Sequence, residues 1–323
     1  MGTLDNRMST HPLYSHRTLK LGTFASNVAG GCVKSTIRGR ADGSWQQARD
    51  ISVAADSMEF EALVPLGRWR GHGGLTDHGG TSLESYTWAA AVAASTQQSG
   101  VFSTSHISTV HPLMAAKQGA TIDQISGGRF ALNLVCGWDR PEMEMFGNRM
   151  LSHEERYRCA AEWLHIIRTL WTSEEPLTFH GEYFDLQRAR ISPQPLCRPC
   201  PPVMNAGTSE TGRQFAAQHC DIAFVTAQNI EDISSQVTSY KAAAQEHGRE
   251  IQVWTYATVV QGENEADARA RYREYVHEAG DWDCADGQMH ALGITEDKMS
   301  ADMRARFREK LVSGGGHLIL GSA

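Results

Sequence analysis

The chain has 323 residues, of which 41% are hydrophobic, and a formal net charge of −7. This size can form one large α/β domain, and the negative charge without a basic run argues against nucleic acid as a partner. The longest apolar runs are too short to cross a bilayer, which argues against a membrane protein.

The cysteines and the N-terminal residues indicate a cytoplasmic protein. The seven cysteines are odd in number and scattered along the chain, so we expect reduced thiols and no disulfide framework. The N-terminal segment lacks the apolar stretch of a secretory signal. The motif CRPC at 197–200 has no second CxxC, and the prolines around it favour a loop ahead of a strand over a redox or zinc pair.

Short apolar strands alternate with longer helical stretches in chain order. The strands are predicted at residues 19–26, 61–66, 101–105, 130–135, 202–206, 222–225 and 252–260. The helices are predicted at residues 45–57, 83–98, 112–125, 152–171, 209–218, 230–247 and 265–278. This order of elements indicates a parallel sheet. Strand 130–135 is apolar at nearly every position, as is typical of a strand covered on both faces.

Local signals support two of the helices. Ser152 and Glu155 form a capping box, in which side chains and backbone donors at a helix start satisfy one another. Apolar residues then recur at helical spacing from Tyr157 to Trp171 and mark one buried face. Pro112 suits the first turn of another helix, because a backbone N–H at that position would have no partner within the helix.

Seven strands with intervening helices predict an α/β fold of the TIM (β/α)8 barrel type in preference to a doubly wound sheet. A Rossmann-type fold would carry G-x-G-x-x-G after its first strand, and the segment FASNVAGGCVKS at 24–35 lacks it. Insertions into the barrel are expected at 67–82 and 172–201. Within the second insertion, FHGEYFDL suggests a short extension strand.

No low-complexity segment or linker divides the chain, so we predict one main domain. Residues 1–18 are assigned to an N-terminal tail and residues 19–323 to the barrel domain. Residues 317–321 suit an eighth strand, but no covering helix follows them. We therefore expect the last β/α unit of the barrel to be absent or truncated.

The strand ends are the first candidates for chemistry, because a β/α barrel carries its active site at the C-terminal ends of its strands. Asn133 lies where the fourth strand ends, so its amide could face the pocket; the alternative is an asparagine bonded to neighbouring backbone. His106 and His111 flank the exit of the third strand and could line a pocket. The 14 histidines include no H-E-x-x-H motif, so we predict no metal site.

The segment NAGTSETGRQFA at 205–216 reads as a strand end, a turn of small residues and a helix start. Its backbone N–H groups, the helix dipole and the Ser209 hydroxyl could cradle a phosphate. The alternative is an ordinary strand-to-helix turn capped by Thr208 or Ser209.

Four longer segments resemble the bacterial luciferase-like flavin-dependent monooxygenases, in the branch of the pyrimidine monooxygenases and near the dimethylsulfone and alkanesulfonate monooxygenases. These segments are TIDQISGGRFALNLVCGWDRPEMEMFG, SHEERYRCAAEWLHIIRTLWT, FHGEYFDL and PPVMNAGTSETGRQFAAQHCDIAFV. The resemblance extends from about residue 19 to residue 321 and is most specific at 119–227. It implies a TIM barrel that binds reduced FMN supplied by a separate NAD(P)H:FMN reductase.

The resemblance also implies roles for individual residues. Asn133 would hydrogen-bond the isoalloxazine ring, Thr109 would face flavin N5, and Trp138 would form an apolar wall of the catalytic pocket or pack at the barrel rim. The remaining cofactor-binding residues implied are Gly67 and Arg68 near the ring, Glu142 at the flavin's polar edge or ribityl chain, and Arg156, Tyr157 and Ser209 at the phosphate.

The implied reaction is oxygenation of a small organic substrate, a heterocycle, an amide or a sulfone, by O2 and reduced FMN through a flavin peroxide, with N5 preferred over C4a. The alternatives are a deazaflavin-dependent oxidoreductase, a barrel that binds flavin without turnover, and, as a distant possibility, a metal-dependent hydrolase. The segment LGRWRGHGG departs from the pyrimidine branch, since Arg68 replaces a lysine and Trp69 and His72 alter the pocket wall. Homo-oligomers are common among such proteins.

Overall fold

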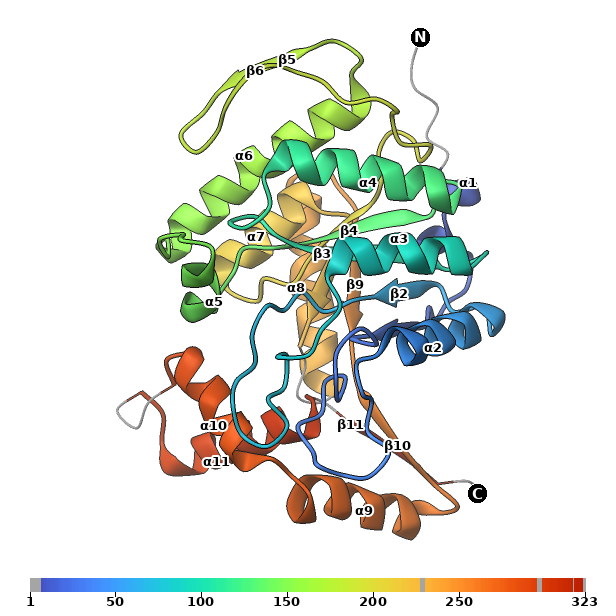
Figure 1. Ribbon diagram of the computed structural model, residues 1–323, viewed down its shortest axis with the longest axis vertical. Helices are drawn as coiled ribbons and strands as arrows, with labels where there is room; N and C mark the ends of the chain where they lie inside the picture. The colour runs from blue at the N-terminus through green and yellow to red at the C-terminus, as the bar shows by residue number, and fades with distance from the viewer. Residues whose placement is uncertain (1–6, 227–229, 295–297, 316, 322–323) are drawn as a thin grey trace.

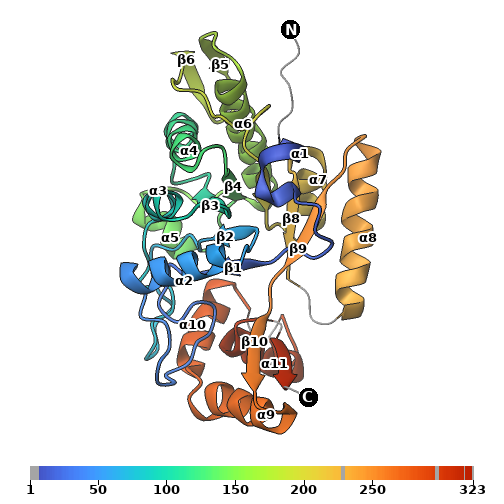
Figure 2. The same ribbon diagram turned by 90° about the vertical axis from the view of Figure 1, so that its right-hand side faces the viewer.

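The computed structural model describes residues 7–226, 230–294, 298–315 and 317–321, and its core is a parallel sheet of seven strands. In spatial order the strands are β1 (Gly22–Phe24), β2 (Ala62–Val64), β3 (Gly100–His106), β4 (Phe130–Val135), β7 (Val203–Asn205), β8 (Ile222–Val225) and β9 (Gln252–Thr255). The outer face carries α2 (Trp45–Ser57), α3 (Ser85–Ser95), α4 (Pro112–Ser126), α6 (His153–Thr172), α7 (Glu210–His219) and α8 (Ile230–Glu246) (Figure 1; Figure 2). The predicted β/α-barrel architecture is confirmed.

The register of β3 and β4 sorts their side chains between the two faces of the sheet. Phe102 and Ala131 belong to the cluster on the inner face, whereas Leu132 packs with the helices on the outer face. Because side chains alternate along a strand, Thr104 and Asn133, which are direct partners in the ladder, also lie on the inner face. The amide in the buried strand therefore points into the barrel.

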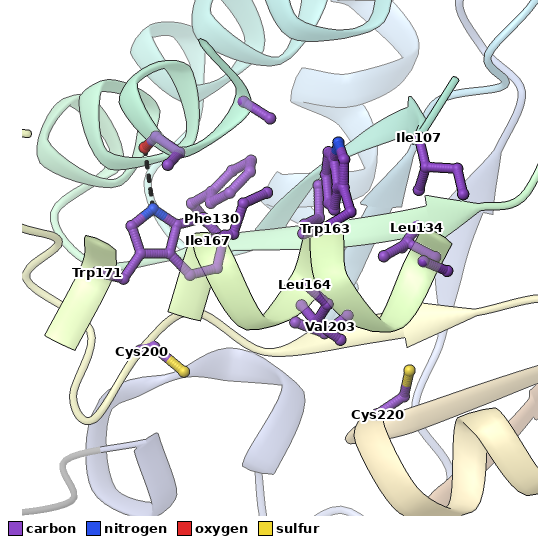
Figure 3. Packing of buried hydrophobic residues seen from close by; sticks show 14 of the residues in the cluster. Ile107, Phe130, Leu134, Trp163, Leu164, Ile167, Trp171, Cys200, Val203 and Cys220 are labelled. Carbon is purple, nitrogen blue, oxygen red and sulfur yellow. Dashed lines mark hydrogen bonds between the residues drawn. The ribbon is translucent and has the colours of Figure 1, made fainter. Parts of the chain in front are cut away.

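The outer core fixes α6 against its neighbours (Figure 3). Trp163 and Trp171 are fully buried, and their indole N–H groups donate to the carbonyl oxygens of Val110 at 2.8 Å and of Ala116 at 2.9 Å. Trp171 also meets the ring of Phe130 edge to face, with centroids 6.4 Å apart. These contacts fix the middle and the C-terminal end of α6 against α4 and the loop after β3.

The 3-10 turn Pro12–Tyr14 fills the end of the barrel at which the strands begin. Leu13 is fully buried in the inner cluster, and its carbonyl oxygen accepts from Gln252 Nε2 at 2.9 Å. His11 Nε2 lies 3.1 Å from the carbonyl oxygen of Phe130. Residues 11–14 thus pack against the start of the sheet. The boundary between an N-terminal tail and the barrel domain at residue 19 stays a prediction.

The last part of the chain departs from the predicted elements. The strand expected at 252–260 is broken into β9 and β10 (Thr258–Gly262), because residues 256–257 carry the chain out of the sheet. The helix expected at 265–278 is α9 (Glu265–Arg273) followed by one π turn (Glu274–Glu278), and two further helices, α10 (Trp282–Ala291) and α11 (Ala301–Ser313), were not predicted individually. The strand expected at 317–321 forms as β11 (His317–Gly321) and pairs in parallel with β10.

Within the described residues no ladder joins β9 or β11 to β1, so the sheet is open on that side. Side chains meet across the opening instead. The ring of Phe24 at the end of β1 lies 5.1 Å from that of Phe224 on β8 and 5.4 Å from that of Tyr256 after β9.

Two short elements were missed or simplified by the sequence prediction. The expected extension strand is a hairpin of β5 (Leu177–His180) and β6 (Asp185–Ala189), which stands away from the sheet (Figure 2). The helix α5 (Arg140–Met145) follows β4 and is capped by the Asp139 side chain. None of the described helices combines the length and hydropathy that a membrane span requires.

Candidate active site

Asn133 on the inner face of β4 is 4% exposed and has a fixed orientation. Its Nδ2 donates to the Thr104 hydroxyl at 3.0 Å, and that hydroxyl donates to the carbonyl oxygen of Pro65 at 2.6 Å. Because the single hydroxyl proton of Thr104 is used on Pro65, its oxygen can only accept from the amide. Asn133 Oδ1 is left buried without a partner among the described residues. A buried oxygen of this kind needs a donor, which a bound molecule or an ordered water can supply.

Thr109, predicted to stand beside Asn133, lies in the loop after β3. It is half-buried, and its hydroxyl reaches the carbonyl oxygen of His106 at 3.4 Å. Thr104 is the threonine that contacts Asn133, and it was not among the predicted residues. Ser103, Thr104 and Ser105 all follow one another on β3, so only the register with β4 shows which hydroxyl faces inward. The role of Thr109 stays a prediction.

Gly67 sits where the loop after β2 passes close to β3. A Cβ atom at this position would lie 3.0 Å from Thr104 Cγ2 and 3.2 Å from His106 Cε1. A small pocket here is lined by Gly67, Arg68, Thr104, His106 and Thr109 together with the start of α3. The absence of a side chain at residue 67 therefore lets the loop close over the inner face.

Arg68 and Glu142, both predicted to contact the flavin, contact each other in a buried ion cluster. The Arg68 guanidinium lies 2.8 Å from Asp139 Oδ2 and 3.4 Å from Glu142 Oε2. Glu142 Oε1 accepts from the backbone N–H of Trp69 at 2.7 Å. The guanidinium also lies over the Trp138 ring, 5.2 Å from its centroid. Trp138 is 37% exposed, so part of its ring remains open to solvent.

The buried site shifts the titration of its ionisable side chains. Burial lowers the pKa of His106 and of His72 to about 4, and the charge of Arg68 adds to both effects. Both imidazoles are therefore neutral near pH 7. Burial raises the pKa of Glu142 above its usual range, an effect that Arg68 opposes.

The three predicted phosphate ligands meet where α6 and α7 begin. Ser209 is the N-cap of α7 and accepts from the backbone N–H of Gly212 at 3.1 Å, and the Tyr157 phenol approaches the same hydroxyl. A Cβ atom at Gly207 would lie 2.3 Å from Tyr157 Oη, so the turn is closed tightly around the phenol. Arg156 donates Nη1 to the carbonyl oxygen of Gly137, while its Nε is buried without a partner among the described residues.

His153 joins this group although it was not among the predicted site residues. Its Nε2 lies 3.0 Å from Ser209 Oγ, and its ring lies 5.1 Å from that of Tyr157. Tyr157 lies four positions after His153 on α6, so the two side chains share one face of the helix, and both approach Ser209 at the start of α7. The helix starts, the hydroxyls and the guanidinium together form a donor-rich cradle suited to an anion.

The predicted site residues therefore fall into two groups. Asn133, Gly67, Arg68 and Glu142 surround the exits of β2, β3 and β4, and the cradle residues lie at the starts of α6 and α7. The bond from Arg156 to Gly137, the residue before Trp138, connects the groups.

All seven cysteines are free thiols, and Cys197 and Cys200 lie buried in the proline-rich loop before β7. In the part of the chain that the structure describes, no group of three or more His, Cys, Asp or Glu side chains could hold a metal ion.

Comparisons with known proteins agree with this arrangement. The model of the luciferase-like monooxygenase family matches residues 19–316. The FMNH2-dependent dimethylsulfone monooxygenase of Pseudomonas putida is 32% identical over 262 residues, which cover 81% of this chain and 70% of that protein. The pyrimidine monooxygenase RutA of Acinetobacter baylyi is 30% identical over 302 residues, which cover 91% of this chain and 80% of that protein.

A solved structure supports the same fold. The crystal structure of riboflavin lyase (RcaE) with modified FMN and riboflavin superposes with a TM-score of 0.80 at 20% identity, covering 90% of this chain and 76% of that one. The match of the family model over most of the chain and the identity to two curated monooxygenases confirm the resemblance. This chain belongs to the luciferase-like monooxygenase family.

Proposed function

We propose that this protein is an FMNH2-dependent monooxygenase that holds its cofactor across the exits of β2, β3 and β4 and the starts of α6 and α7. Family membership and the FMNH2-dependent relatives support this reaction class. The cofactor would come from a separate NAD(P)H:FMN reductase, as the resemblance to this family implies.

The chain's own residues fit such a cofactor. Arg156, Tyr157, Ser209 and His153 would bind the phosphate through hydroxyl and cationic donors. Asn133 Oδ1 would accept from an N–H of the ring, and Thr104 would keep that oxygen turned toward it. This unpartnered, oriented oxygen is the observation that carries the proposal.

The reaction also needs an environment that excludes water. Reduced FMN, when bound, supplies two electrons to O2, so that one oxygen atom enters the substrate and the other leaves as water. Trp69, which lines the small pocket, and Trp138 are 41% and 37% exposed, and we expect them to shield the site from solvent once substrate is in place. The relatives act on dimethylsulfone and pyrimidines by name, so we expect a small, uncharged heterocycle, amide or sulfone as substrate.

The test is the replacement Asn133→Ala in the full chain. We expect the variant to keep its fold, to bind FMNH2 roughly 3- to 10-fold more weakly, since one hydrogen bond is lost, and to lose coupled product formation. Binding is measured by anaerobic titration with FMNH2, and coupling by the ratio of product to hydrogen peroxide in the presence of a reductase, NADH and O2. A wild-type chain that binds neither FMN nor FMNH2 would refute the proposal.

A further inference from the structure

The buried ion cluster beside the pocket holds fewer cations than carboxyl groups. The side chains of Arg68, Asp139 and Glu142 are 6%, 1% and 1% exposed. Arg68 lies nearer to Asp139, at 2.8 Å, than to Glu142, at 3.4 Å. A single guanidinium offsets the charge of one buried carboxylate, and a second buried carboxylate without a cation is strongly disfavoured. Glu142 therefore shares the charge of Arg68 at the longer of the two distances, and the cluster would carry a net negative charge if both carboxyl groups were ionised.

The surrounding side chains do not supply the missing cation. The other titratable groups that face the cluster or its pocket are His72, His78, His106, Lys34, Arg70, Glu84 and Tyr86. Tyr86 and His78 are neutral near pH 7, because burial raises the pKa of the phenol and lowers that of the imidazole to about 3. His72 and His106 are also neutral near pH 7, because burial lowers the pKa of each to about 4. Lys34 donates to the carbonyl oxygen of Leu311 and faces Asp281, while the charge of Arg70 acts on His72. Glu84 is occupied in capping α3.

The two oxygens of Glu142 differ in their surroundings. Oε1 accepts the backbone N–H of Trp69 at 2.7 Å. Oε2 accepts from Arg68 Nη1 at 3.4 Å and lies 3.7 Å from His106 Nε2, a separation that must shorten by about 0.7 Å before the two groups can share a hydrogen bond. A neutral imidazole can accept a proton from a carboxylic acid at that nitrogen. His106 lines the same pocket as Thr104 and Thr109, so it is the group through which a proton on Oε2 could reach the pocket.

We infer that Glu142 is a protonated carboxylic acid in the resting protein and that Glu142 and His106 together donate the proton that the oxygenation reaction consumes. This role rests on the proposed monooxygenase function and differs from that of a direct flavin ligand. Starting from the reduced anion, the reaction is FMNH⁻ + H⁺ + O2 + substrate → FMN + oxygenated substrate + H2O. The O–H bond of Glu142 breaks, the proton ends in water, and the carboxylate regains a proton from solvent before the next turnover.

The protonation state is tested without cofactor by infrared difference spectroscopy of the full chain. Wild type minus Glu142→Gln should show the carbonyl stretch of a protonated carboxylic acid at pH 7. The matched control, Glu144→Gln on the same helix, should show carboxylate bands only, because that side chain is 58% exposed. In Asp139→Asn, which preserves the helix cap, Glu142 should be the remaining carboxyl group beside Arg68, and its acid band should vanish. Carboxylate bands for Glu142 in the wild type at pH 7 would overturn the inference.

The role in the reaction is tested with Glu142→Gln, which resembles the protonated acid in shape and charge. We expect FMNH2 affinity to stay within about twofold of wild type, while coupled product formation falls on the order of 100-fold, as for loss of a general acid. Loss of FMNH2 binding in this variant alone would make Glu142 a cofactor ligand and overturn the inference. Failure of the wild type to bind FMNH2 would instead remove the proposed function, and the infrared result would still decide the protonation state.

Discussion

Thr104 on β3 and Thr109 in the loop after β3 differ in their hydrogen-bond partners. The Thr104 hydroxyl accepts from the Asn133 amide and donates to the carbonyl oxygen of Pro65, whereas the Thr109 hydroxyl donates to the carbonyl oxygen of His106. The orientation of the amide therefore depends on Thr104. A hydroxyl that has a single proton can fix a neighbour in this way only when a second acceptor claims that proton.

Replacing each threonine by valine separates the two roles. Thr104→Val keeps the side-chain shape but frees the Asn133 amide to rotate, so we expect FMNH2 binding to weaken roughly 3- to 10-fold. Thr109→Val should change binding by less than about twofold. Titration of both variants with FMNH2 checks this, and a larger loss in Thr109→Val would give Thr109 the position beside the ring that the family resemblance implies.

At the scale of elements, the first turn of α6 carries much of the anion cradle. The capping box predicted from Ser152 and Glu155 is present, with Ser152 Oγ accepting at 3.3 Å and Glu155 Oε2 accepting at 2.8 Å. His153, Arg156 and Tyr157 follow within the same turn and a half. A frayed helix start would displace all three of these side chains together.

Ser152→Ala tests this coupling. Loss of the cap should lower the free energy of unfolding by about 1 kcal/mol and weaken binding of FMN more than binding of riboflavin, which lacks the phosphate. Ser300→Ala, at the N-cap of α11, is the control: it should cost similar stability without changing the preference for FMN. If Ser152→Ala weakened the binding of FMN and of riboflavin equally, the cap would have no role in supporting the phosphate cradle.

Elements were predictable from the sequence where burial alone defines them. The strands at 130–135 and 222–225 match to the residue, because both are continuous apolar runs covered on two faces. The helix α5 escaped prediction since six residues show no period, and its start depends on Asp139, whose partner Arg68 lies 71 positions away. Pairings of this kind, like that of Thr104 with Asn133, follow from strand register and leave no local signal.

At the scale of the whole molecule, buried neutral histidines make the fold sensitive to acid. Burial lowers the pKa of His11, His72 and His106 to about 4 and that of His78 to about 3. An unfolded chain binds protons at these side chains near their ordinary pKa of about 6.5. The stability that the neutral forms provide is thus complete above about pH 6.5 and is lost as the pH falls toward about 4.

Thermal unfolding measured between pH 8 and pH 4 checks this expectation. The melting temperature of the wild type should fall steadily below about pH 6.5. His78→Gln can still donate to the carbonyl oxygen of Gly31, which His78 Nε2 contacts at 2.8 Å, so the variant should fold and lose less stability across that range. A flat wild-type profile between pH 6.5 and pH 4.5 would contradict neutral burial of these side chains.

Among the described residues, the two edge strands of the main sheet, β1 and β9, are not joined by a backbone ladder. Across this opening Phe24, Phe224 and Tyr256 contact one another ring to ring. Aromatic contacts of this kind each contribute on the order of 1 kcal/mol beyond the area that they bury. The spacing between β1 and β8 is therefore set by the bulk of three aromatic rings, so replacing one of them by a smaller residue would remove the spacer between these strands.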